Sequence, residues 1–170
     1  VVISPLANEY PLIHYNWVQD NIKKVDQASN GRIGYIYIPD MGPEGLNEFA
    51  RYFYPQLDKE GVIIDDRANG GGNVSPMILE RLSREPYRLT MGRGTSHVGT
   101  VPDAVQVGPK VCLINKYSAS DGDLFPWGFR ALGLGKLIGT RTWGGIVGIS
   151  GSLPYMDGTD IRVPFFTSYD

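Results

Sequence analysis

The chain has 170 residues, a mass of 18.7 kDa, 42% apolar and 20% charged residues, and a formal net charge of −2. This length and composition fit about one globular domain and exclude a disordered chain. The slightly acidic balance argues against nucleic acid as a partner, and no apolar run approaches the ~20 residues that cross a bilayer, so we expect no membrane association.

The cysteine and histidine content limits the chemistry further. Cys112 is the only cysteine, which rules out an internal disulfide and favours a reducing, cytoplasmic compartment. With only His14 and His97 as further candidate zinc ligands, we expect no metal site and no cofactor.

Hydrophobic periodicity predicts strands that alternate with helices. In chain order it predicts a helix over 15–24, a strand over 32–38, a helix over 46–57, a strand over 61–65, a helix over 75–82, a strand over 110–115, a helix over 121–134 and a strand over 136–140. Pro126 is expected to be tolerated only in the first turn of its helix. Residues 83–108 show no period, and a hairpin is predicted from 152–156 and 161–165, joined by the turn 157–160.

The order of these elements indicates the fold class. The predicted strands are short and continuously apolar, as in sheets buried on both faces. We therefore expect an α/β protein with a mostly parallel sheet covered by helices. One domain, residues 29–170, accounts for the pattern, with 1–28 as a lead-in from an upstream domain and the whole as a fragment of a longer chain.

Two loops follow buried strands at the sheet edge where open α/β proteins bind ligands. The loop 115–123 places Ser120 between a strand and a helix, where a serine is either an exposed nucleophile near unpaired N–H groups or simply a helix cap. The loop 66–73 contains three consecutive glycines, which either bring N–H groups to a ligand or form a flexible turn.

Weaker candidates have simple structural explanations. Asp121 and Asp123 could hold a hard cation, but acidic residues in a first helical turn more often complement the helix dipole. His14 and His97 are ordinary structural or surface histidines unless the fold brings one of them to Ser120.

Four segments together carry a resemblance to a known family. In this order and spacing the chain reads IGYIYIPDMGPEGLNEF, GVIIDDRANGGGNVS, NKYSASDGD and LGLGKLIGTRTWGGIVGI. These segments closely resemble the tricorn branch of the tail-specific (C-terminal processing) serine peptidases over about residues 32–164. The resemblance implies a ClpP/crotonase-like core.

The resemblance also implies roles for particular residues. Ser120 matches the family nucleophile, and the backbone N–H groups of Asp121 and Gly72 match the two oxyanion donors. The resemblance further implies that Gly71, Ile146 and Val147 line the substrate cleft.

The chain also departs from the family pattern. The lysine that activates serine in classical tail-specific peptidases is missing from 142–146, which fits a Ser–His system. Neither histidine occupies a family position, and no segment matches the family glutamate, so the resemblance implies that base and acid lie outside this chain. In the tricorn branch an acidic residue gives a preference for basic substrate side chains. The corresponding position here falls near Leu89 and Thr90, which are uncharged, so the resemblance implies a preference for apolar substrate side chains.

Three functions follow as hypotheses. The first is a serine peptidase domain that cleaves oligopeptides by acyl transfer, within a closed homo-oligomer such as a hexamer. The second is a non-catalytic peptide-binding or assembly module, which the missing base and acid favour. The third is acyl-thioester chemistry of the crotonase type, for which a shared fold is the sole argument.

Overall fold

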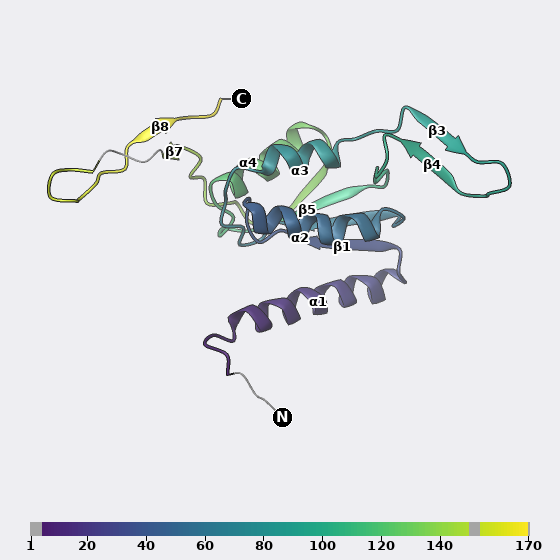
Figure 1. The fold of residues 1–170 in the computed structure, drawn as a ribbon, viewed down its shortest axis with the longest axis horizontal. Helices are drawn as coiled ribbons and strands as arrows, with labels where there is room; N and C mark the ends of the chain where they lie inside the picture. Colours follow the sequence, from purple (N-terminus) through teal and green to yellow (C-terminus); the bar gives the residue numbers. More distant parts are fainter. Residues whose placement is uncertain (1–4, 150–153, 170) are drawn as a thin grey trace.

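A computed structural model describes residues 5–149 and 154–169. In chain order the elements are α1 (Tyr10–Ser29), β1 (Ile33–Tyr37), α2 (Pro43–Phe53), the 3-10 turn η1 (Tyr54–Gln56), β2 (Gly61–Asp65), α3 (Ser75–Leu82), β3 (Arg88–Met91), β4 (Val98–Val101), β5 (Lys110–Ile114), α4 (Asp121–Ala131), β6 (Gly135–Gly139), β7 (Gly148–Ile149) and β8 (Pro164–Phe166). Figure 1 shows their arrangement.

A parallel sheet of four strands, in the order β1-β2-β5-β6, organises the molecule. Alternate side chains of a strand point to opposite faces, and β1 uses both. Ile36 faces α2, α3 and α4, whereas Tyr35 and Tyr37 face α1 with Val18. The helices therefore lie on both sides of the sheet (Figure 1), which confirms the α/β class expected from the sequence.

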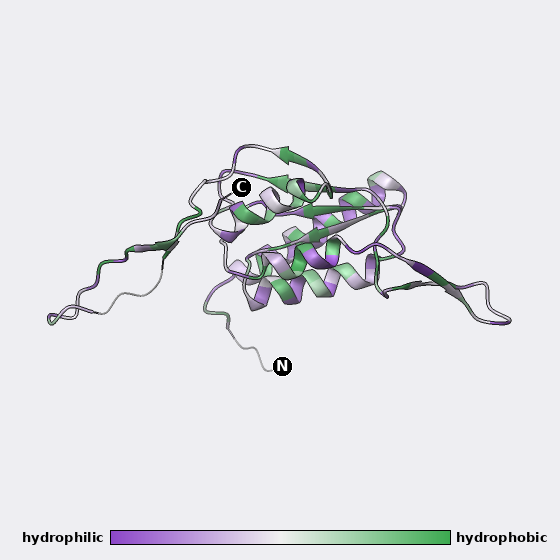
Figure 2. Cartoon of the chain, turned by 90° about the horizontal axis from the view of Figure 1, so that it is seen from above, coloured by the Kyte–Doolittle hydropathy of each residue, from purple (hydrophilic) through white to green (hydrophobic). Residues whose placement is uncertain are grey.

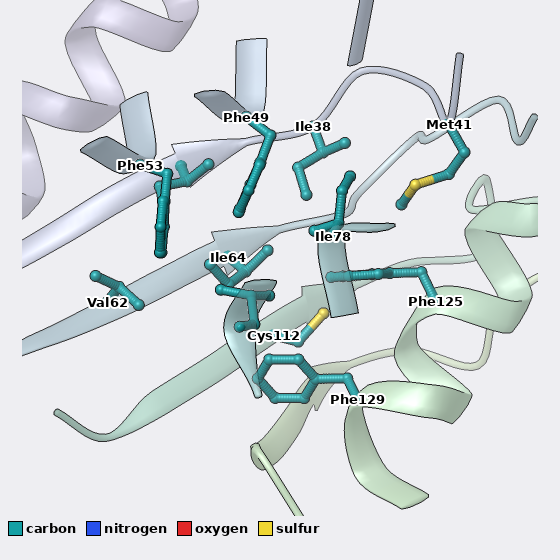
Figure 3. Packing of buried hydrophobic residues seen from close by; sticks show 12 residues of the cluster. Ile38, Met41, Phe49, Phe53, Val62, Ile64, Ile78, Cys112, Phe125 and Phe129 are labelled. Atoms are coloured by element: carbon teal, nitrogen blue, oxygen red, sulfur yellow. The ribbon is translucent and has the colours of Figure 1, made fainter. Parts of the chain in front are cut away.

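The main core lies between the sheet and the three helices α2, α3 and α4 (Figure 3). Phe53, Ile64, Phe125 and Phe129 are each no more than 1% exposed. Each such side chain stabilises the fold by roughly 1.5–3 kcal/mol through its burial. This packing fixes α4 against β5, and thereby fixes the turn that precedes α4.

Helix α1 is longer than the predicted span of 15–24. It begins at Tyr10 and ends where Asn30 and Gly31 take positive φ angles of 53° and 76°. Val18 is its single buried residue within the described helix. Apolar residues are only weakly concentrated on one face of this helix, so hydrophobic periodicity predicted only its central part.

The expectation for Pro126 was wrong. It is the sixth residue of α4, beyond the first turn, and it is buried. Proline there removes a hydrogen bond to the carbonyl four residues earlier. Burial of its neighbours Phe125 and Phe129 offsets that loss.

Residues 83–108 are not irregular throughout, because β3 and β4 pair as an antiparallel hairpin. All four residues of β3 are exposed, so no buried face gives the segment a hydrophobic period. The hairpin extends away from the sheet, as Figures 1 and 2 show.

The predicted C-terminal hairpin is correct in its turn and wrong in its strands. The Tyr155 N–H donates to the Thr159 carbonyl at 2.7 Å, and Asp157 accepts from Thr159. The paired strands, however, are Gly148–Ile149 and Pro164–Phe166. Residues 152 and 153 of the predicted first strand lie outside the described residues.

Candidate active site

The two candidate loops leave the same edge of the sheet. Strands β2 and β5 run parallel, with Asp65 opposite Leu113, so their carboxyl ends coincide. The Asp66 N–H donates to the Leu113 carbonyl on β5 at 2.9 Å, and hydrogen bonds then join the loops, among them Ala68 N–H to Asn115 Oδ1 at 3.0 Å and Ala119 N–H to the Asn69 carbonyl at 2.9 Å. The glycine loop and the serine turn therefore form one structure.

Gly71 is in direct contact with the serine turn. A Cβ atom on this glycine would lie 2.7 Å from Cβ of Ser120 and 2.6 Å from the Ala119 carbonyl oxygen. Its φ of +85° also disfavours any other residue. The sequence placed both residues at the site, and the fold brings them together.

Gly72 lies against the loop between β1 and α2. It forms a parallel bridge with Met41, and a Cβ atom would lie 2.0 Å from the Met41 carbonyl oxygen. That carbonyl accepts the N–H groups of Asn73 and Val74. The Gly72 N–H itself donates to no acceptor in the described ranges, so it is free to bind a ligand.

Ser120 has a strained backbone, with φ 57° and ψ −119°. Positive φ is uncommon for residues other than glycine and is concentrated at functional turns. The residue is exposed, and its hydroxyl does not cap α4. The capping explanation raised by the sequence therefore does not account for this serine.

The first N–H groups of α4 face the same turn. Gly122, Asp123 and Leu124 donate back to Ala119 and Ser120, whereas the Asp121 N–H has no acceptor among the residues described. A helix N-terminus carries partial positive charge. It can therefore stabilise an oxyanion that develops beside Ser120.

Asn69 joins the two turns, although the sequence analysis did not identify it as a site residue. It is fully buried; its amide donates to the Ile38 carbonyl at 3.1 Å, and its Oδ1 accepts the Gly71 N–H at 2.9 Å. Its carbonyl accepts from Ala119. These partners are distant from Asn69 in sequence, so no local pattern reveals the link.

Two hydrogen bonds of Ser118 fix the serine turn to its neighbours. Its hydroxyl donates to the Asp66 carbonyl at 2.8 Å, and its own carbonyl accepts the Trp143 N–H at 3.0 Å. The segment 141–147 is thereby held beside the turn.

Asp121 and Asp123 link the turn to its surroundings. Asp121 accepts the Ser75 hydroxyl at 2.5 Å and the Ser75 N–H at 3.0 Å, and so completes the N-terminus of α3. Asp123 Oδ1 accepts the Gly144 N–H at 2.7 Å. Within the described chain no group of three potential ligands could hold a metal ion.

A cavity of about 1100 Å³ begins beside Asp121 and runs along α4. Ile146 lines it together with Thr142 and Gly144, whereas Val147 is not part of its wall and is 48% exposed. Of the two residues that were expected to line the cleft, Ile146 lines this cavity and Val147 does not.

Neither histidine lies in these two turns. His14 stacks on Trp17 and against Tyr37, on the α1 face of the sheet. His97 lies in the exposed loop between β3 and β4, and Leu89 lies on the same hairpin.

No helix in the described part of the chain is long and apolar enough to cross a membrane.

Charged groups hold the end of β2. Asp65 is fully buried and accepts from Arg67 Nε at 2.9 Å and from the Tyr35 hydroxyl at 2.5 Å. Burial and the Asp65 charge raise the pKa of Tyr35, and hydrogen bonding to Asp65 raises the pKa of Arg67. This pair fixes the strand end from which the glycine loop departs.

Comparisons with known proteins give the family and the fold of the chain. Residues 32–170 match the model of peptidase family S41. The chain is 48% identical over 165 residues to a tricorn protease of Thermoplasma volcanium, covering 95% of this chain and 16% of the relative. It is 38% identical over 163 residues to tricorn protease homolog 1 of Streptomyces coelicolor, covering 96% of this chain and 15% of the relative.

Solved structures give the same result. The crystal structure of the tricorn protease matches with a TM-score of 0.89 and 42% identity, over 96% of this chain and 16% of that chain. The photosystem II D1 C-terminal processing protease, at 19% identity and a TM-score of 0.54 over 78% of this chain and 36% of that chain, shares the fold. The chain spans about 16% of the length of its tricorn relatives.

Proposed function

The chain belongs to peptidase family S41, a family of serine peptidases, and on that basis we propose that it supplies the nucleophile of an enzyme that hydrolyses oligopeptides. The observation that carries the proposal is the close approach of Gly71 to Ser120, which joins an exposed, strained serine to the loop that carries the free N–H group of Gly72. The resemblance of both loops to the family motifs supports it further.

The proposed reaction is acyl transfer. Ser120 Oγ attacks the scissile carbonyl, and the N–H groups of Gly72 and Asp121 stabilise the tetrahedral oxyanion. A base takes the Ser120 proton and delivers it to the leaving amine as the intermediate collapses to an acyl-enzyme, which water then hydrolyses to restore the Ser120 hydroxyl. Gly71 and Ile146 contact the peptide beside the scissile bond, whereas the same role for Val147, which lies outside the cavity wall, rests on the family resemblance alone.

The base comes from outside these 170 residues. A serine hydroxyl is a weak nucleophile at neutral pH and needs a base that is oriented by a third group. We propose a histidine and a carboxylate from the rest of the enzyme, which leaves this chain inactive on its own. The side-chain preference in this account is apolar.

Steady-state and burst kinetics test the proposal on the full-length protein with a peptide ester. We expect turnover with a burst of the leaving group, and loss of both in Ser120→Ala, because no acyl-enzyme forms. Ser83→Ala serves as the matched control, since its hydroxyl is exposed at the far end of α3. Turnover that survives Ser120→Ala would overturn the assignment.

The second candidate is a peptide-binding or assembly module without catalysis. The positions of His14 and His97, away from both turns, favour it. It predicts no turnover by the full-length protein, together with peptide affinity that Ser120→Ala leaves unchanged. The same kinetic and binding measurements therefore separate the two functions.

Finer properties are also part of the proposal. Residues 29–170 form the peptidase core, of the ClpP/crotonase type, with 1–28 as the lead-in. A buried free thiol at Cys112 supports a reducing, cytoplasmic location. Exposed apolar side chains on the two hairpins, such as Met91 and Phe165, support a homo-oligomer, proposed as a hexamer. Light scattering on the full-length protein tests the last point, and a monomer would contradict it.

A further inference from the structure

The segment 141–147 lies beside the serine turn without regular structure of its own. It follows β6 and forms neither helix nor strand. Ile146 nonetheless forms part of the wall of the large cavity that begins beside Asp121. The position of this wall therefore depends on the contacts that the segment makes with the rest of the molecule.

Two hydrogen bonds hold this segment among the residues that the structure describes. The Trp143 N–H donates to the Ser118 carbonyl at 3.0 Å, and the Gly144 N–H donates to Asp123 Oδ1 at 2.7 Å. Both acceptors belong to the serine turn and the first turn of α4. In the described chain, Asp123 is thus the one side chain that holds the segment by a hydrogen bond.

The hydrogen bonding of the Asp123 side chain does not serve its own helix. Asp123 is the third residue of α4, where an acidic side chain can reach back to the N–H of the residue before the helix. Its Oδ1 instead accepts from Gly144, and its Oδ2 has no donor within the described ranges. The side chain is 6% exposed and lines the same cavity as Ile146. A hydrogen bond to a buried carboxylate is stronger than one between neutral groups.

The bond from Gly144 lies at a bend of the segment. Gly144 has a φ of +89°, which favours glycine. At the next position, a Cβ atom on Gly145 would lie 2.0 Å from the Trp143 ring, so the indole folds back over this residue. The chain then reaches Ile146 at the cavity. Loss of the bond to Asp123 would therefore free the bend from which this part of the wall departs.

We infer that Asp123 is a positioning residue that holds one wall of the peptide cleft against the serine turn. Its carboxylate fixes the bend at Gly144, and the bend fixes the part of the wall that Ile146 forms. The inference rests on the proposed function, because it takes the cavity as the place where a peptide binds. Since Asp123 acts through Gly144, its loss weakens peptide binding more than it slows the chemical step.

Steady-state kinetics of the full-length protein with an oligopeptide ester test this role in two variants, Asp123→Asn and Asp123→Ala. Both remove the charge, but only asparagine keeps an oxygen that accepts the Gly144 N–H. We expect Asp123→Ala to raise KM about tenfold and to lower kcat by less than about threefold. In Asp123→Asn both constants should stay within about threefold of the wild type.

The split between KM and kcat separates this role from a merely structural one. A variant that is only destabilised loses active molecules, which lowers kcat and leaves KM unchanged. Equal KM values for Asp123→Asn and Asp123→Ala would therefore overturn the inference, as would a fall in kcat alone.

Hydrogen–deuterium exchange tests the hydrogen bond without reference to activity. We expect the Gly144 N–H to be protected in the wild type and in Asp123→Asn, and to exchange at least about tenfold faster in Asp123→Ala. Equal exchange in all three proteins would overturn the inference. A wild type that shows this protection but no turnover would contradict the peptidase proposal and still confirm that Asp123 positions the segment.

Discussion

At the scale of single residues, the site depends on positions that tolerate only one side chain. Ser120 has a positive φ without being glycine, and Gly71 leaves the space that this turn needs. Strain of this kind costs about 1–3 kcal/mol and persists only where the surroundings enforce it. Here the fully buried Asn69 holds both turns by their backbones.

Gly71→Ala should therefore disturb the serine turn specifically. The added methyl group meets Ser120 Cβ at 2.7 Å and adopts an unfavourable φ, so we expect a loss of about 1–3 kcal/mol of stability and at least tenfold slower acylation. Urea unfolding and phosphonate kinetics measure the two effects. Gly70→Ala is the matched control, because a Cβ there meets no atom within 4 Å. Equal behaviour of the two variants would contradict the account.

At the scale of elements, the ends of α3 and α4 are joined by one buried hydrogen-bonded pair. The Asp121 carboxylate accepts both the hydroxyl and the N–H of Ser75, so the first turns of both helices are fixed together. The orientation of the Asp121 N–H beside Ser120 thus depends on a residue 46 positions earlier in the chain.

Ser75→Ala should loosen this junction. It removes one donor and leaves a buried carboxylate oxygen unpaired, which costs about 1–3 kcal/mol. We expect that loss of unfolding free energy in urea titrations. Reactivity at Ser120 should also fall, but by less than in Gly71→Ala. Ser83→Ala removes an exposed hydroxyl at the other end of α3 and should change stability by less than about 0.5 kcal/mol. A Ser75→Ala protein as stable as Ser83→Ala would refute the junction.

The elements were predictable where the signal is local. Residues 61–65 and 110–115 are short apolar runs between turn residues, and they form adjacent parallel strands as expected. The hairpin at Arg88–Val101 could not be predicted, because neither of its faces is buried in the described structure. The link through Asn69 also escaped the sequence, because its partners Ile38 and Ala119 lie 31 and 50 residues away by their numbers.

At the scale of the whole molecule, the sheet is covered unevenly. Three helices pack on one face, whereas the other face is packed by α1 over β1 and β2 (Figure 1). Ile138 on β6 is 51% exposed, and Trp127 on α4 is 45% exposed. Such apolar exposure, with two hairpins extending from the body (Figure 2), is typical of a surface that is covered in an assembly.

The buried Asp66 also shapes the stability of the whole molecule with pH. Its folded pKa is raised, so its contribution to stability is fully present below the unfolded pKa, near 3.8, and is lost as pH rises toward the folded value. The difference in unfolding free energy between wild type and Asp66→Asn should therefore shift in favour of the variant from pH 4 upward. A difference that is flat with pH, in urea titrations, would show that Asp66 is ionised in the folded protein.

The central claim is that Ser120 is a nucleophile that is served by two free N–H groups, those of Gly72 and Asp121. Reaction of the full-length protein with a serine-directed phosphonate, followed by mass spectrometry of the digested adduct, tests this claim most directly. The account predicts a single adduct on Ser120, absent in Ser120→Ala and retained in Ser83→Ala, which alters an exposed serine. An adduct on another residue, or peptidase activity without any adduct at Ser120, would contradict it.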